Sequence, residues 1–76
     1  MKQNLNNLLR LKINGTFYLY RVVSSSNILD LINYLGFNKN VIVIDYNGYI
    51  LEKIRWDQTF LQNNDSLEIL SIAGGG

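Results

Sequence analysis

The chain has 76 residues, contains neither cysteine nor histidine, and carries a formal net charge of +1. Disulfides, zinc sites and imidazole catalysis are therefore excluded, and the scattered basic residues argue against a dedicated nucleic-acid surface. No apolar run approaches the ~18 residues of a membrane span, and residues 1–8 are too polar for a signal peptide. Stability must come from the packing of apolar side chains, which make up 47% of the residues.

The first predicted element is a β-hairpin. Residues 9–13 alternate apolar and basic side chains, which is typical of a strand with one solvated face. Asn14 and Gly15 follow, and this pair favours a two-residue turn because both residues tolerate positive φ. Residues 17–23 are rich in aromatic and β-branched side chains and are predicted to form the returning strand.

A short helix is predicted next. Asn27 is an N-cap residue, and Asp30 places a carboxylate in the first turn, where it favours the free N–H groups. Gly36 stands where a left-handed C-terminal cap is needed. Between them an apolar stripe with helical spacing is formed by Ile28, Leu31, Ile32 and Leu35.

The second half of the chain is predicted to contribute three more strands. The strands are expected at 41–44, at 49–51 and at 66–72. A tight turn at Asn47-Gly48 joins the first two. Irregular structure over 52–62, with a turn around Trp56-Asp57, and a further turn at 63–65 precede the last strand. In the last strand, Leu67, Ile69 and Ser71 are expected on one face. Trp56 is interpreted as a core residue in preference to a partner contact, because one buried Trp removes a large area from water.

The element order β-β-α-β-β-β predicts an α+β fold of the β-grasp type, a mixed sheet of four to five strands with the helix across it. The first and last strands are expected to be central, parallel neighbours, because the segment between them forms a crossover. We expect an N-terminal extension (residues 1–8), a β-grasp domain (9–72) and a flexible reactive tail (73–76).

The tail is the most informative segment, because the sequence ends on Ala73-Gly74-Gly75-Gly76. Three glycines bury no side chain and lose much backbone freedom on ordering, so a fold gains nothing from them. A thin, extended strip can instead carry its carboxylate into a narrow site on another protein. The alternative is an ordinary frayed chain end.

The C-terminal half resembles the ThiS family, the small sulfur carriers of thiamine thiazole biosynthesis, over about residues 41–76. The residues that carry the resemblance are Asn47-Gly48-Tyr49-Ile50-Leu51, Trp56, Leu61, Asn64-Asp65, Leu67-Glu68-Ile69 and Ala73-Gly74-Gly75-Gly76. The glycine ending alone is shared with the molybdopterin-synthase small subunit and with ubiquitin-like modifiers. The chain departs from the family pattern in its residues before the first strand and in Glu52, where Pro is common.

The resemblance implies a protein co-substrate and not an enzyme. A ThiF-type adenylyltransferase would use ATP to adenylate the carboxylate of Gly76, and a persulfide sulfur donor would convert it to a thiocarboxylate. Gly74 and Gly75 would thread the partner's active site, and a ThiG-type thiazole synthase would receive the sulfur. No bound cofactor or metal is expected, and the compartment is the cytosol or the plastid stroma.

Two alternatives remain open. Gly76 could serve molybdopterin synthesis, or form an isopeptide bond as a ubiquitin-like modifier does. A plain β-grasp interaction module with an unreactive end is the alternative from another class. Removal of Gly75 and Gly76 would distinguish a sulfur carrier from a docking module, because it should abolish sulfur transfer but leave simple docking nearly unchanged.

A docking surface is predicted beside the tail. Tyr18 and Tyr20 share one face of the second strand, opposite Phe17 and Leu19. One of the two pairs must face away from the helix, and a tyrosine-bearing open face would suit a partner; the alternative is an ordinary half-solvated sheet surface. Leu70, Ile72 and Ala73 are expected to extend that face as an apolar patch. The acidic residues are isolated along the chain and suggest no acid/base pair or metal site; Asp65 is expected to serve the turn before the last strand.

Overall fold

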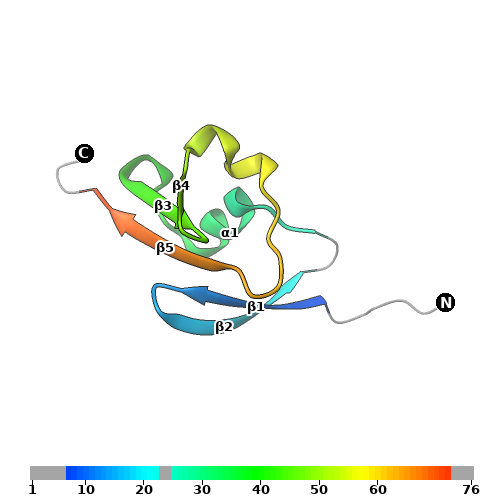
Figure 1. The fold of residues 1–76 in the computed structure, drawn as a ribbon. Helices are drawn as coiled ribbons and strands as arrows, with labels where there is room; N and C mark the ends of the chain where they lie inside the picture. Colours follow the sequence, from blue (N-terminus) through cyan, green and yellow to red (C-terminus); the bar gives the residue numbers. More distant parts are fainter. Residues whose placement is uncertain (1–6, 23–24, 73–76) are drawn as a thin grey trace.

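The computed structural model describes residues 7–22 and 25–72, which form a five-stranded mixed sheet with a helix packed across one face (Figure 1). The strand order is β2-β1-β5-β3-β4. In chain order the elements are β1 (Asn7–Ile13), β2 (Thr16–Val22), α1 (Ile28–Leu35), the 3₁₀ helix η1 (Lys39–Val41), β3 (Ile42–Tyr46), β4 (Tyr49–Leu51), the 3₁₀ helix η2 (Lys53–Gln58) and β5 (Ser66–Ser71). The predicted β-grasp fold is confirmed.

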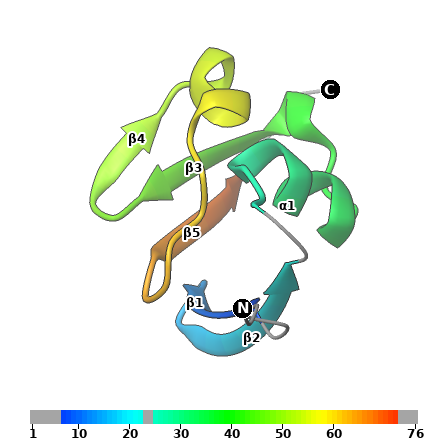
Figure 2. The same ribbon diagram turned by 90° about the vertical axis from the view of Figure 1, so that its right-hand side faces the viewer.

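Strand β5 lies in the middle of the sheet, between the two hairpins (Figure 2). On one side it runs parallel to β1, with Ile13 opposite Leu67, and on the other side it runs antiparallel to β3, with Ile44 opposite Ile69. The predicted parallel pairing of the first and last strands is therefore confirmed. The strand that leads into the C-terminal tail is the third of five in the sheet.

Both hairpins close through the same two-residue turn. Asn14 and Gly15 have φ values of 50° and 86°, and Asn47 and Gly48 have φ values of 51° and 93°. Positive φ at both central positions is the type I′ geometry, which matches the twist of the flanking strands. Both predicted Asn-Gly turns are confirmed.

Helix α1 is capped at both ends as its sequence predicts. The Asn27 side chain accepts from the Asp30 N–H at 2.8 Å, and the Asp30 carboxylate accepts from the Asn27 N–H at 3.1 Å. Gly36 adopts φ 83° and donates its N–H to the Ile32 carbonyl at 3.1 Å. These reciprocal contacts satisfy backbone groups that a short helix would otherwise leave without partners.

The core lies between α1 and the helix side of the sheet. Its buried side chains are Leu11, Ile13, Ile28, Leu31, Ile32, Ile42, Ile44, Trp56, Leu61, Leu67 and Ile69. Trp56 is 1% exposed and donates its Nε1–H to the Leu51 carbonyl at 2.9 Å, so its interpretation as a core residue is confirmed. Leu35, the last residue of the predicted apolar stripe, is instead exposed at the helix end.

Some predicted boundaries differ from the structure. β1 begins two residues earlier than predicted, and β3 begins one residue later because Val41 closes η1. The segment predicted to be irregular contains η2, whose 3₁₀ turns have no strong sequence period. The predicted last residue of the second strand, Val23, lies outside the described residues.

Candidate functional site

The candidate site is the C-terminal end of β5, from which the tail leaves the sheet. The structure describes the chain as far as Ile72, whose N–H donates to the Val41 carbonyl at 2.8 Å. This bond continues the β3–β5 ladder beyond Ser71, which pairs with Ile42. The predicted site residues Ala73, Gly74, Gly75 and Gly76 lie outside the described residues, and their roles stay predictions.

Asn14 holds the middle of β5 from the β1 side. Its Oδ1 accepts from the Ile69 N–H at 2.7 Å, and its Nδ2 donates to the Ile69 carbonyl at 3.3 Å. The side-chain amide thus replaces a strand residue and continues the ladder past the end of β1. Each such hydrogen bond contributes about 1 kcal/mol to the stability of the fold. The pair therefore fixes β5 two residues before its last residue.

Asn47 holds the beginning of β5 from the β3 side. Its backbone N–H donates to the Ser66 carbonyl at 2.7 Å, and its Oδ1 accepts from the Ser66 N–H at 2.7 Å. Its Nδ2 donates to Asp65 at 3.0 Å. The asparagines of the two turns therefore contact opposite edges of the same strand.

Asp65 is the acceptor that joins the Asn47 turn to the turn before β5. It is 7% exposed and accepts from the Tyr46 hydroxyl at 2.6 Å, the Asn47 side chain at 3.0 Å and the Gln62 N–H at 2.8 Å. The predicted role in the turn before β5 is confirmed, and the bond to Tyr46 adds a tertiary contact. Burial raises the pKa of the Tyr46 phenol far above its usual value, and the bond to Asp65 and its negative charge act in the same direction.

The sheet face away from α1, here called the open face, carries an apolar patch beside this site. Leu70 is 50% exposed and pairs with Val43 on this face, opposite in direction to the buried Leu67 and Ile69. Ile72 is also exposed and follows in the same alternation. Leu70 and Ile72 are therefore exposed as the predicted patch requires, whereas its third member, Ala73, lies outside the described residues.

The tyrosines predicted to share that face lie on the other one. Tyr18 pairs with the buried Leu11, and Tyr20 pairs with Leu9, so both point to the helix side. The Tyr20 ring meets the ring of Tyr34 of α1 edge-on at 5.6 Å, as expected for residues on the helix side. The expectation of one surface formed by Tyr18, Tyr20, Leu70 and Ile72 is wrong, because the two pairs stand on opposite faces.

The open face of the first hairpin is basic and aromatic instead. The Arg10 guanidinium lies 4.0 Å from the centroid of the Phe17 ring, and the Lys12 ammonium lies 5.6 Å from it. Phe17 and Leu19 are both more than half exposed. The other half of the open face carries Asp45 and Glu68, which are paired across β3 and β5, so its charge changes sign between the two hairpins.

The described residues offer neither a metal-binding cluster nor a membrane-spanning helix. Across residues 7–22 and 25–72, no three or more acidic side chains lie together as they would around a metal ion. Within the same ranges, no helix is long and apolar enough to cross a membrane.

These features define a small β-grasp protein whose central strand leads directly into a glycine tail. The sequence profile of the ThiS family matches residues 11–76, and the chain belongs to the ThiS family. The match extends through the terminal glycines and across both Asn-Gly turns.

The solved structures agree with this assignment. The crystal structure of the thiamine biosynthesis protein ThiS from Geobacter metallireducens superimposes with a TM-score of 0.77 at 28% identity, covering 90% of this chain and all of that one. A solution structure of a thiamine biosynthesis protein from the same organism gives a TM-score of 0.73 at 28% identity, covering 90% of this chain and 88% of that one.

Sequence relatives carry a name without a function. The chain is 40% identical over 57 residues to the uncharacterized protein ycf40 of Trieres chinensis, covering 75% of this chain and 78% of the relative. It is 39% identical over 46 residues to ycf40 of Porphyra purpurea, covering 60% and 65% of the two chains.

Proposed function

We propose that this protein is a sulfur carrier for the thiazole ring of thiamine and that the carboxylate of Gly76 carries the sulfur. The observation that supports it most is the ThiS-family match, which runs to the last glycine. The position of β5 adds support, because a strand held on both sides gives the tail a fixed starting point.

The proposed chemistry begins with activation. A free carboxylate is a poor electrophile, since its charge repels nucleophiles and oxide is a poor leaving group. A ThiF-type adenylyltransferase joins the Gly76 carboxylate to AMP and releases pyrophosphate from ATP. The terminal sulfur of a persulfide then displaces AMP, and a thiol cleaves the resulting S–S bond to leave a thiocarboxylate and a disulfide.

The tail supplies access and the partners supply catalysis. Gly74 and Gly75 carry no side chain, so they can pass through a narrow channel to the adenylate site. The thiocarboxylate then donates its sulfur to a ThiG-type thiazole synthase. In this scheme the carrier is a co-substrate, ATP binds to the activating enzyme, and the reactions take place in the cytosol or the plastid stroma.

The open face is the proposed docking surface for these partners. Leu70 and Ile72 lie at the root of the tail, and exposed apolar side chains at such a position favour an interface. Ala73 would continue the contact into the tail. The paired charges of Asp45 and Glu68, with Arg10 and Lys12 across the face, would orient the partner.

A coupled assay tests the proposal. The full chain is incubated with a ThiF-type enzyme, ATP, a persulfide donor, a ThiG-type synthase and the phosphorylated carbon substrate and nitrogen-containing substrate of that synthase, and thiazole phosphate is measured. We expect product that depends on the carrier and disappears when Gly76 is deleted. Thiazole formation that is equally fast with the deleted chain would refute the carrier role, whereas sulfur delivery to a molybdopterin-synthase large subunit alone would move it to the molybdopterin alternative.

A further inference from the structure

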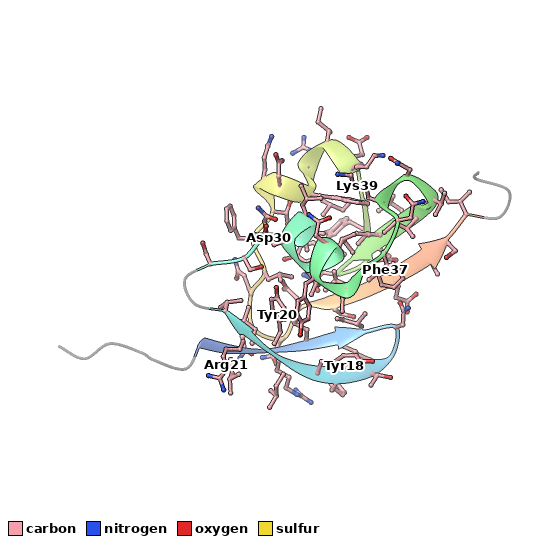
Figure 3. All side chains as sticks on the ribbon, turned by 180° about the vertical axis from the view of Figure 1, so that it is seen from behind. Tyr18, Tyr20, Arg21, Asp30, Phe37 and Lys39 are labelled. Atoms are coloured by element: carbon pink, nitrogen blue, oxygen red, sulfur yellow. The ribbon has the colours of Figure 1, made fainter. Side chains whose placement is uncertain are left out.

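A groove on the helix side of the sheet has no role in the proposed sulfur transfer. It has a volume of about 650 Å³ and lies between β2 and the C-terminal end of α1. Its apolar walls include Tyr18, Tyr20, Tyr34, Leu35 and Phe37. Figure 3 shows Tyr18 and Tyr20 on β2 and Phe37 just after α1. A cavity of this size, lined by aromatic and aliphatic groups, is in the range that binds side chains or small ligands.

One wall of this groove is a sheet edge, because β2 is an outermost strand and pairs with β1 alone among the described strands. The direction of its backbone groups follows from β1. Lys12 of β1 donates its N–H to the Asp65 carbonyl, and Asn14, just after β1, donates its N–H to the Leu67 carbonyl, both at 2.9 Å, so the backbone groups of these two residues are directed toward β5. The backbone N–H and C=O groups of the alternate residues Leu11 and Ile13 are therefore directed toward β2.

The backbone groups of β2 that no described strand pairs can now be assigned. Leu11 pairs with Tyr18, and Ile13 pairs with Thr16, through the backbone groups directed at β2. The intervening residues Phe17 and Leu19 direct their N–H and C=O groups away from β1, off the sheet. Leu19 lines the groove although its side chain points to the open face, as expected if its backbone forms the rim.

An extended peptide is a ligand that fits both the exposed edge of β2 and the adjoining groove. A strand added to β2 would bond to the four backbone groups of Phe17 and Leu19, and every second side chain would enter the groove. Neither feature alone selects such a ligand. Together they offer the backbone ladder that gives affinity and the apolar pocket that gives sequence preference.

The charge of the hairpin indicates what flanks those apolar residues. Residues 7–22 contain Arg10, Lys12 and Arg21 and no acidic side chain. We propose that the β2 edge and the adjoining groove bind an extended segment of a partner protein that has apolar residues at alternate positions and acidic residues beside them. This site goes beyond the proposed function, because it lies on the face opposite Leu70 and needs no tail.

A synthetic peptide with apolar residues at alternate positions and acidic residues between them, acetyl-DVDIDVDI-amide, is a suitable probe for the full-length ¹⁵N-labelled chain. We expect saturable binding below about 1 mM, the largest amide shifts at Phe17 and Leu19, and slower hydrogen exchange at both amides. A peptide with serine in place of each Val and Ile keeps the charge and should not bind.

Two pairs of variants separate this site from unspecific effects. Leu19→Pro removes an outward N–H from β2, and Ile50→Pro does the same on β4, the other edge strand, where no groove is described; both positions are well exposed. Tyr34→Ser removes part of the groove wall without changing the backbone. Its control is Tyr49→Ser, since the two tyrosines are 74% and 75% exposed.

We expect Leu19→Pro and Tyr34→Ser to weaken binding of the probe at least about tenfold, and both controls to bind as the original chain does. If Leu19→Pro does not fold, the tyrosine pair decides. The proposal is overturned by no binding at about 1 mM, by shifts centred on Leu70, or by equal loss in the Tyr34 and Tyr49 variants. It is also overturned if the free chain forms a dimer that Leu19→Pro abolishes, because a second copy would then occupy the edge.

Discussion

The two hairpins of this fold share a turn sequence but hold β5 in different ways. Asn14 and Asn47 have nearly the same φ, 50° and 51°, and the side chain of each forms hydrogen bonds to a residue of the adjacent strand β5. Asn14 makes two bonds to Ile69 with its side chain alone. Asn47 divides its bonds between Ser66 and Asp65.

The difference shows what each turn contributes to the candidate site. The turn of β3 and β4 fixes the beginning of β5 through a cluster that includes a buried carboxylate. The turn of β1 and β2 contacts β5 nearer the tail. Beyond it, the described partners of β5 lie on the β3 side, where Ile42 pairs with Ser71 and the Val41 carbonyl accepts from the Ile72 N–H. The last described residues before the tail are thus held from the β3 side, and no described strand pairs with them on the β1 side.

Loss of Asp65 should have the largest effect on stability. Asp65→Ala removes the acceptor of Tyr46, Asn47 and Gln62 and leaves three donors of partly buried hydrogen bonds without this partner. We expect a loss of about 2–4 kcal/mol in the free energy of unfolding, measured by urea denaturation. Asp57→Ala, at an exposed position, is the control and should change it by less than about 0.5 kcal/mol. An equal loss in both variants would contradict the central role of Asp65.

Glycine substitutions compare the two turns directly. Asn14→Gly and Asn47→Gly keep the positive φ but remove the side-chain bonds, and we expect each to cost about 1–2 kcal/mol. Hydrogen exchange should then accelerate at the Ile69 amide in the first variant and at the Ser66 amide in the second. Acceleration at the same amide in both variants would show that the turns do not act on separate parts of β5.

The Tyr46–Asp65 contact, in the second hairpin, should make the stability of the fold sensitive to alkaline pH. Because the pKa of Tyr46 is raised in the folded state, its neutral form stabilises the fold fully below the unfolded value, about 10, and this stability is lost as the pH rises above it. Denaturation midpoints measured between about pH 8 and pH 11 should fall. Tyr46→Phe should flatten that part of the fall, whereas Tyr49→Phe should leave it unchanged.

The smallest effect on stability is expected on the open face. Leu70→Ser at its half-exposed position should change the free energy of unfolding by less than about 0.5 kcal/mol. It should nevertheless weaken docking to a ThiF-type enzyme, measured as a rise in the carrier concentration needed for half-maximal pyrophosphate release. Ile50→Ser, on the same face but farther from the tail along the sheet order, is the control. Equal effects of the two would argue against a contact centred on the root of the tail.

Most of the fold could be predicted from local sequence, because its signals act over a few residues. The Asn27 and Asp30 caps, Gly36 and both Asn-Gly turns report backbone geometry directly. The bonds between Asn14 and Ile69 join residues 55 positions apart, and nothing in the turn sequence indicates them.

The sequence did contain information that places Tyr18 and Tyr20 on the helix side of the sheet. A two-residue turn places Ile13 opposite Thr16 and therefore Tyr18 opposite Leu11, so the face of Tyr18 follows from the hairpin register. The face of Leu70 depends on the pairing of β5 with β3, which is not local. The groove could not be predicted either, since it forms where α1 ends above β2.

The most direct test of the account is the intact mass of the full chain after incubation with a ThiF-type adenylyltransferase, ATP and a persulfide donor. We predict a gain that matches the replacement of one oxygen by sulfur, located at Gly76 and lost when Gly76 is deleted. An unchanged mass, with a partner that demonstrably adenylates another carrier, would contradict the claim that the terminal carboxylate carries sulfur.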